Sequence, residues 1–374
     1  MQQDDTGLDR IEDAIAAIAA GELVVVVDDL DRENEGDLIM AASKATPEKM
    51  AMMIRHTSGI ICVPMTAERA GELHLPPMVA NNIDPLRTAF TVSVDYKRGM
   101  TTGISATERA NTARALANSN CGGADFLRPG HIFPLIAREG GVLVRSGHTE
   151  AATDLAALAG LEPLGVLAEI VNDDGTVKRL KELKAFALEH RLKIISIEDL
   201  ISYRMQRESF VNCIGEGPIR VDGLNGRIRV YSSRFDPMQH VVAVFGDVRG
   251  RDDVPVRIHR EQPIADYFAK IDKPTTWLAN AMEPIRAAGV GVLMLLRNPA
   301  AGELAEAAES DPAAGEHHGS AQARRERWRE VGVGAQILRD LGVRSITEIA
   351  TDERNYVGLT GFGIGVSKTV IVER

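Results

Sequence analysis

A run of four valines at residues 24–27, followed at once by acidic residues, constrains the fold of this chain more than any other feature. A continuous β-branched run of this length is typical of a strand buried on both faces, as in layered α/β domains. Before it, residues 11–18 carry apolar side chains at helical spacing, and we expect Asp9 to cap this helix and Gly21 to end it. The pattern therefore predicts a sheet covered by helices.

The alternation of strands and helices continues through the N-terminal half. We expect helices capped by Thr46 and by Ser105, and strands at residues 89–96 and 140–147. The second of these strands leads into a loop, after which Thr149 is expected to cap another helix. The predicted fold class is α/β (α+β), with an N-terminal three-layer domain built on a mixed sheet.

Two domains are expected in a chain of this length. Residues 1–205 form the first, and residues 210–374 form a second, smaller α+β domain. Within the second domain, strands are expected at residues 228–231 and 241–245.

The composition excludes several classes of function. A formal net charge of -10 argues against a nucleic-acid partner, because binding to a phosphate backbone needs a basic surface. Three cysteines without a CxxC pair favour a reducing compartment over a disulfide framework. The acidic N-terminus and the lack of a long apolar run predict a cytoplasmic protein without a membrane partner.

The acidic segment at residues 28–37 follows the valine run directly. Its carboxylates are those of Asp28, Asp29, Asp31, Glu33, Glu35 and Asp37, and Arg32 lies among them. A solvated acidic turn is one interpretation of such a segment. Its position at the end of a core strand favours a ligand site, where a cation would relieve the repulsion between the carboxylates.

Two further segments carry histidines. In residues 145–151 (RSGHTEA), a helix N-terminus beside an arginine is suited to an anion, and His148 could be a metal ligand or an acid/base. A capped helix with a surface histidine is the alternative. In RPGHIF, His131 follows a proline-glycine pair, which alone indicates a structural loop. Together these groups suit Mg²⁺ (or Mn²⁺) and a phosphorylated, hydroxyl-rich substrate better than they suit zinc.

Five segments in this order resemble the 3,4-dihydroxy-2-butanone-4-phosphate synthases, and the similarity extends over residues 8–203. The segments are VVVVDDLDRENEGDLIMAA, RHTSGIICVPM, FTVSVDYKRGMTTGISATERA, RPGHIFPLIAREGGVLVRSGHTEAATDLAALAGL and AEIVNDDGT. The resemblance implies an enzyme of riboflavin biosynthesis that converts D-ribulose 5-phosphate to L-3,4-dihydroxy-2-butanone 4-phosphate and formate. Because members of the family are dimers, it also implies a homodimer.

The resemblance assigns a role to each matching position. Glu33 and His148 would ligate Mg²⁺ or Mn²⁺, and His131 and Glu169 would be the catalytic acid/base pair. The substrate phosphate would lie near Thr149. The implied substrate-binding residues are Arg32, Glu33, Asp37, Arg145, Ser146, Gly147, His148, Thr149 and Glu169.

From residue 211 onward the chain resembles GTP cyclohydrolase II in RIHREQPIADYFAKI, VGVGAQILRDLGVRS and GLTGFGIGV. These are packing and turn positions, so the resemblance implies that the fold is retained. The family's three zinc-binding cysteines fall at Gln262, Lys273 and Thr275. Its general-base aspartate falls at Arg327, although Arg329 is kept. Since protonated lysine cannot ligate zinc, we expect neither zinc nor GTP cyclohydrolase activity here.

Three alternatives remain open at the level of the sequence. The protein could be bifunctional, with a cyclohydrolase site that uses altered ligands. It could be a metal-dependent aldolase or isomerase acting on a sugar phosphate. It could also be a non-catalytic scaffold of two inactive domains.

Overall fold

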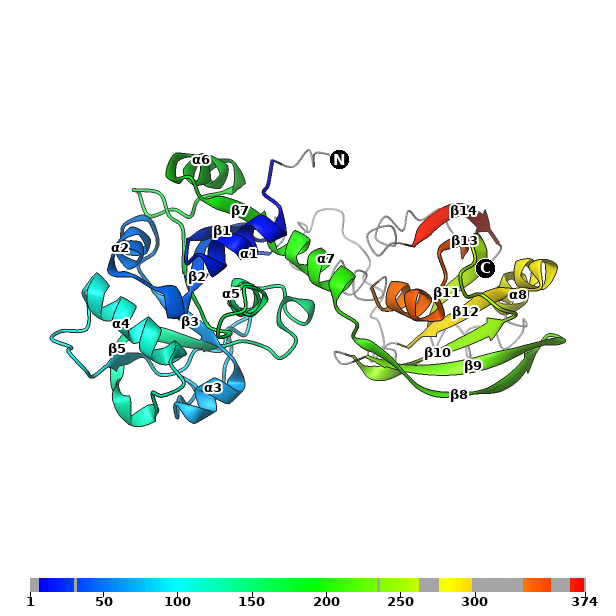
Figure 1. Cartoon of the computed structure of the whole chain (residues 1–374), viewed down its shortest axis with the longest axis horizontal. Helices are drawn as coiled ribbons and strands as arrows, with labels where there is room; N and C mark the ends of the chain where they lie inside the picture. Colours follow the sequence, from blue (N-terminus) through cyan, green and yellow to red (C-terminus); the bar gives the residue numbers. More distant parts are fainter. Residues whose placement is uncertain are drawn as a thin grey trace. The chain divides into compact units, whose positions relative to one another are not determined.

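The computed structural model describes residues 7–29, 32–233, 236–261, 276–297, 332–350 and 364–372. The chain divides into two compact units, Met1–Tyr203 and Arg204–Arg374. Each unit contains one seven-stranded mixed sheet (Figure 1), which confirms the predicted fold class.

The first unit alternates strands and helices along the chain. Its strands are β1 (Val24–Val27), β2 (Gly36–Ala41), β3 (Cys62–Met65), β4 (Val94–Tyr96), β5 (Phe126–Ile136), β6 (Gly165–Glu169) and β7 (Lys193–Ser196). Its helices are α1 (Ile11–Ala19), α2 (Pro47–His56), α3 (Ala67–Glu72), α4 (Ala106–Ala117), α5 (His148–Leu158), α6 (Leu180–His190) and α7 (Ile197–Arg207). Short 3-10 turns lie at η1 (Ala42–Lys44), η2 (Gly123–Asp125) and η3 (Gly141–Leu143).

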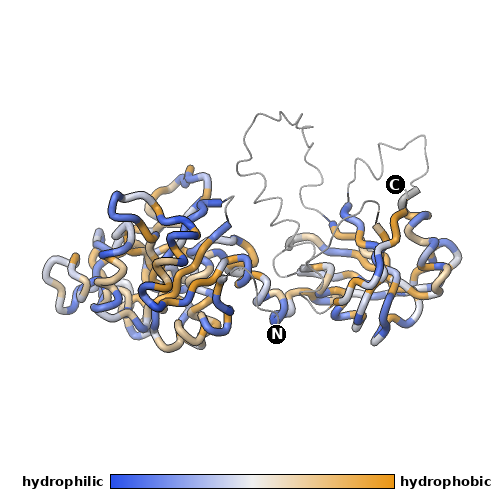
Figure 2. Tube along the Cα trace, turned by 90° about the horizontal axis from the view of Figure 1, so that it is seen from above, coloured by the Kyte–Doolittle hydropathy of each residue, from blue (hydrophilic) through white to orange (hydrophobic). Residues whose placement is uncertain are grey.

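The sheet of the first unit has the strand order β4-β5-β3-β6-β2-β1-β7. Strand β1 pairs parallel with β7 and antiparallel with β2, and its four valines are buried. Val25 and Val27 belong to a core cluster shared with α2, α4 and α6. Val24 and Val26 belong to another, shared with α1, α5 and α7. The unit therefore has three layers, and Figure 2 shows hydrophobic residues along its central strands.

Several local predictions are confirmed. Thr46 caps α2 by accepting a hydrogen bond from the backbone of Lys49, and Pro47 is the first residue of that helix. Ser105 and Glu108 form a reciprocal capping box at the start of α4. Gly21 has a positive φ of 80°, as expected for a residue that ends a helix.

The expected cap of the first helix is wrong. The N-cap position of α1 is Arg10, which makes no side-chain capping bond. Asp9 instead accepts hydrogen bonds from Lys193 Nζ at 2.7 Å and from the backbone nitrogen of Ile194 at 2.9 Å. Asp9 therefore joins the start of the chain to β7 at the edge of the sheet.

The strand expected at residues 140–147 is also wrong, because this segment contains the 3-10 turn η3. Gly140 and Gly141 have φ values of 95° and 62°, which L side chains rarely adopt. The Asp154 carboxylate of α5 accepts the backbone N–H of Val142 at 2.8 Å. The hydrogen bond to Asp154 thus holds this apolar segment in a turn. Of the strand expected at residues 89–96, only β4 forms as a regular strand.

The second unit has the strand order β14-β13-β11-β12-β10-β9-β8. Its described elements include β8 (Val211–Val221), β9 (Leu224–Ser233), β10 (Asp236–Phe245), β11 (Val254–Arg260), α8 (Thr276–Ala288), β12 (Gly291–Leu296), β13 (Ser345–Ala350) and β14 (Gly365–Ile371), and residues 332–341 are also helical. The strands predicted at residues 228–231 and 241–245 lie within β9 and β10. The positions that correspond to zinc ligands and to the general base, Gln262, Lys273, Thr275 and Arg327, lie outside the described residues.

Among the described residues, no helix is both long enough and apolar enough to cross a membrane.

Candidate active site

Asp37, Glu169 and His131 lie on three strands of the sheet of the first unit, β2, β6 and β5. Asp37 pairs with Glu169 across β2 and β6. The parallel pairing of Cys62 with Phe133 places Ile60 level with His131, whereas the bridge between Thr57 and Ile170 places Ser58 beside Glu169. Since alternate residues of a strand share a face, the carboxylates and His131 project toward the face that α5 covers. One strand, β3, lies between the strands of Glu169 and His131.

The acidic loop between β1 and β2 is organised by Asp28. Its carboxylate accepts the backbone N–H groups of Glu33 and Glu35, both at 2.9 Å, and a hydrogen bond from Arg32 Nη1 at 3.1 Å. Arg32 Nη1 also pairs with the carboxylate of Glu33. The side chains of Asp28 and Arg32 are only 1% and 7% exposed, so the loop is not a solvated acidic turn.

His148 is brought to this loop by the start of α5. It lies inside the helix at its first position, since the N-cap is Gly147, and the expectation that Thr149 is the cap is therefore wrong. His148 Nε2 donates to the carbonyl oxygen of Val26 at 3.1 Å, because a carbonyl can only accept. Burial lowers the pKa of His148 to about 4. The neutral ring therefore keeps a lone pair on Nδ1, the form that can ligate a metal.

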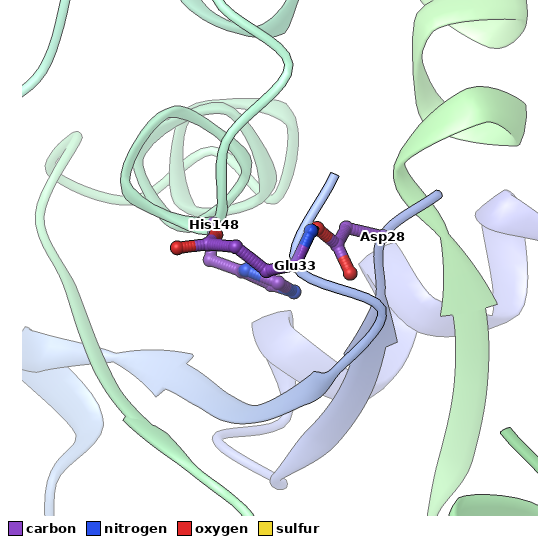
Figure 3. A group of neighbouring side chains, drawn as sticks. All are labelled: Asp28, Glu33 and His148. Atoms are coloured by element: carbon purple, nitrogen blue, oxygen red, sulfur yellow. The ribbon is translucent and has the colours of Figure 1, made fainter. Parts of the chain in front are cut away.

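Two overlapping groups of side chains could hold a cation. The potential ligand atoms of Asp28, Glu33 and His148 all lie within 4.8 Å of one another, as do those of Glu35, Asp37 and His148. Figure 3 shows Asp28, Glu33 and His148 gathered between the acidic loop and the start of α5. In addition, the buried Oδ1 atom of Asp37 has no hydrogen-bond partner among the described residues. A divalent cation fits this set of oxygen-rich ligands.

The raised pKa values of carboxylates in the acidic loop also favour a bound cation. Burial raises the pKa of Glu33, opposed by the nearby charge of Arg32. Burial, together with Glu33 and Glu169, raises the pKa of Glu35 to about 7. Burial and Glu169 also raise the pKa of Asp37 well above its usual value. The carboxylates repel one another, which disfavours their charged forms. A bound cation would favour the charged forms instead.

The segment from Arg145 to Thr149 is tightly packed. Arg145 Nη1 donates to Glu150 at 2.6 Å, and its Nε and Nη2 atoms donate to the carbonyl oxygen of Leu86. Ser146 and Thr149 are buried, and a Cβ atom on Gly147 would lie 2.3 Å from Arg145 Nη1. The guanidinium of Arg145 therefore secures the start of α5 through protein partners.

The sequence did not indicate Ser58 as part of the site. Its hydroxyl donates to Glu169 Oε2 at 2.6 Å, and its backbone nitrogen donates to the carbonyl oxygen of Glu169 at 2.8 Å. Although Ser58 lies in one of the segments that resemble the family, nothing in its local pattern points to Glu169. The pairing arises only because β3 and β6 are neighbours.

His131 lies within β5 rather than in the structural loop that RPGHIF alone suggested. Its Nδ1 atom lies 2.7 Å from Asp95 Oδ2, and its backbone nitrogen donates to Asp95 Oδ1 at 2.9 Å. Asp95 also was not indicated by the sequence. The structure thus gathers Arg32, Glu33, Asp37, Glu169 and His148 together, whereas His131 stands apart on β5.

Gly130 allows β5 to pass close to β4, and we expect Gly130→Ala to loosen this pair of strands. An ideal Cβ at Gly130 would lie 2.0 Å from the carbonyl carbon of Val94 and 2.3 Å from the nitrogen of Asp95. Because backbone atoms cannot rotate away, the substitution should destabilise the strand pair by about 3 kcal/mol. Hydrogen–deuterium exchange of β4 and β5 measures this. Gly122→Ala, with nothing within 4 Å of the added Cβ, is the control. Equal protection in both variants would contradict the prediction.

A model of the 3,4-dihydroxy-2-butanone 4-phosphate synthase family matches residues 12–203. This chain belongs to that family. A model of the GTP cyclohydrolase II family matches residues 216–371. The protein is therefore a 3,4-dihydroxy-2-butanone 4-phosphate synthase of riboflavin biosynthesis, fused to a domain of the GTP cyclohydrolase II family.

Two curated relatives come from Arabidopsis thaliana. The chain is 47% identical to the monofunctional riboflavin biosynthesis protein RIBA 2, chloroplastic, over 97% of its own length and 77% of the relative. It is 46% identical to the bifunctional protein RIBA 1, chloroplastic, over 96% of its own length and 68% of the relative. Relatives of nearly equal similarity thus include one named monofunctional and one named bifunctional.

Two solved structures resemble the synthase. One is RibBX, a two-domain 3,4-dihydroxy-2-butanone 4-phosphate synthase from A. baumannii, with a TM-score of 0.78 and 36% identity over 97% of this chain and 99% of that one. The other is a 3,4-dihydroxy-2-butanone 4-phosphate synthase in complex with two magnesium ions. It has a TM-score of 0.52 and 47% identity, and covers 54% of this chain and 98% of its own.

Proposed function

We propose that the first unit converts D-ribulose 5-phosphate to L-3,4-dihydroxy-2-butanone 4-phosphate and formate, with Mg²⁺ or Mn²⁺ held by Glu33 and His148. The observation that carries this proposal is the closeness of the potential ligand atoms of Glu33 and His148, together with a buried Asp37 Oδ1 atom that has no hydrogen-bond partner in the part of the chain that the structure describes. The magnesium ions in the related synthase structure support the choice of metal.

The reaction requires a proton to leave carbon beside a carbonyl, a rearrangement of the carbon skeleton, and release of one carbon as formate. A bound divalent cation supplies charge stabilisation at the substrate oxygens. Arg32, Asp37 and residues 145–149 bind the substrate, with its phosphate near Thr149 at the N-terminus of α5. Binding of the phosphate, which does not react, orients the substrate carbons that do react.

Glu169 and His131 exchange protons with the substrate. Ser58 orients Glu169 by donating to Oε2, which leaves Oε1 for the substrate. His131 is a second acid/base on the same face of the sheet. Because β3 lies between their strands, the two groups serve different proton transfers along the substrate.

We also propose a homodimer. Segments near His131 carry exposed apolar side chains, with Ile60 50% exposed, Ile104 52% exposed and Leu127 40% exposed. Exposed apolar side chains near a polar site are suited to burial against a second copy of the chain. Light scattering coupled to size-exclusion chromatography tests this, and a monomer at micromolar concentration would contradict it.

Product identification tests the reaction itself. Ribulose 5-phosphate incubated with enzyme and magnesium should give formate and a four-carbon phosphate in equal amounts by NMR. An aldolase would give two shorter fragments without formate, and an isomerase would give a five-carbon phosphate. A folded, metal-loaded protein that leaves the substrate unchanged would favour the scaffold.

For the second unit, we propose that GTP cyclohydrolase activity is absent. The support is chemical, because Gln262, Lys273 and Thr275 stand where the family has zinc-binding cysteines. We expect less than about one zinc per ten chains, and no turnover of GTP, since thiolates are needed for a stable site of this kind. Elemental analysis and a GTP assay measure this.

The matched control replaces all three positions by cysteine, which should restore zinc binding if the fold is retained. Stoichiometric zinc together with GTP turnover in the unaltered protein would establish the bifunctional alternative.

A further inference from the structure

We propose that Asp95 is a positioning residue that sets the tautomer and orientation of His131, so that Nε2 faces the substrate as a base. This inference rests on the acid/base role of His131 proposed above. No motif in the sequence and no feature of the acidic loop indicates Asp95. It is the geometry between β4 and β5 that assigns it.

Both oxygens of Asp95 are used by the same residue. Oδ1 accepts the backbone N–H of His131 at 2.9 Å, and Oδ2 lies 2.7 Å from Nδ1 of its ring. The Asp95 side chain is 5% exposed, whereas that of His131 is 42% exposed. A carboxylate can only accept, so Nδ1 carries the proton and Nε2 keeps the lone pair on the more open side.

The surroundings hold this pair in place. The backbone of Gly103 passes directly over it, since an ideal Cβ there would lie 2.2 Å from Asp95 Oδ2 and 2.8 Å from His131 Nδ1. The buried guanidinium of Arg109 attracts the charge of Asp95 and donates to the carbonyl oxygen of Gly59 at 3.1 Å. The close backbone therefore keeps the Asp95 carboxylate from turning away from His131, and the guanidinium attracts it.

The proton transfer balances without another reactant. His131 Nε2 takes a proton from the substrate, and the ring becomes an imidazolium whose charge Asp95 stabilises through Nδ1–H. The electron pair of the broken bond stays on the substrate. Nε2 later returns the proton, so Asp95 remains ionised throughout and His131 ends neutral.

Asp95→Asn is the test, because it preserves shape and changes hydrogen-bond polarity. The backbone N–H of His131 can only donate, so the amide oxygen must face it and the NH₂ group must face Nδ1. Nδ1 then becomes an acceptor, and the proton moves to Nε2. We expect kcat to fall about 100-fold or more while KM changes little.

Nitrogen-15 NMR of histidine-labelled protein reads the tautomer directly, and His131→Ala identifies the signal among the nine histidines. The expected result is an Nδ1-protonated His131 in the wild type and an Nε2-protonated one in Asp95→Asn. In the His131→Ala background, Asp95→Asn should cause no further loss of kcat, because it acts only through His131.

Failure of this inference is distinguishable from failure of the proposed function. If His131→Ala is inactive but the tautomer is unchanged in Asp95→Asn, the positioning role is overturned and His131 remains the acid/base. The positioning role is also overturned if the tautomer switches without loss of kcat while His131→Ala is inactive. If His131→Ala keeps full activity, the proposed role of His131 fails, and the positioning role of Asp95 in the reaction is overturned with it.

Discussion

Glu33→Gln should abolish formate release, reducing kcat/KM by at least about 100-fold even at high magnesium concentration. The amide is nearly the same size as the carboxylate but carries no charge to offer a divalent cation. Burial already raises the pKa of Glu33, so the folded protein gains little from its charge. We therefore expect stability to stay within about 1 kcal/mol of the wild type. Formate assays across a magnesium titration, together with thermal melting, measure both effects.

Glu68→Gln on α3 is the matched control, because it makes the same change at an exposed carboxylate. It should leave formate release and metal affinity unchanged. Binding of Mn²⁺, followed by its electron paramagnetic resonance signal, should weaken in Glu33→Gln alone. If Glu33→Gln bound Mn²⁺ as tightly as the wild type, Glu33 would not be a ligand.

Glu169→Gln should have a comparably large effect through a different step. An amide cannot accept or return a proton, and general acid–base catalysis typically contributes about 100- to 10,000-fold. Metal binding should be retained, because Glu169 is not among the side chains grouped as potential ligands. We therefore expect kcat to fall while the affinity for Mn²⁺ stays close to that of the wild type.

Ser58→Ala is expected to have a smaller effect on kcat than Glu169→Gln. It removes the hydroxyl that donates to Glu169 Oε2 at 2.6 Å but leaves the carboxylate in place. Its kcat should fall by about 10-fold, corresponding to one lost hydrogen bond to a charged group. A Glu169→Gln enzyme that turned over at the wild-type rate would remove Glu169 from the chemistry, whatever the result for Ser58→Ala.

Much of the first unit could be predicted from local sequence. The valine run at residues 24–27 forms β1, and Thr46 and Ser105 cap their helices as expected, because these signals act over a few residues. The acidic loop could be predicted to be a ligand site from its position after a core strand. The proposed ligands within it came from the family resemblance rather than from spacing.

Several of the errors and omissions share one physical cause, which is contact between segments that are separated in the sequence. Residues 140–147 have the composition of a strand, but the Asp154 carboxylate holds Val142 in a 3-10 turn. Ser58 and Glu169 are 111 residues apart, and Asp95 and His131 are 36 apart. Only the order of strands in the sheet brings these partners together. Sequence patterns with short periods contain no information about such pairings.

The metal requirement of the first unit is tested most directly by formate release from ribulose 5-phosphate, measured with EDTA-stripped protein before and after magnesium is restored. We expect no formate from the stripped protein, full recovery with magnesium, and no requirement for zinc. Formate release at an undiminished rate in the metal-free protein, or recovery only with zinc, would contradict the assignment of the site to Glu33 and His148.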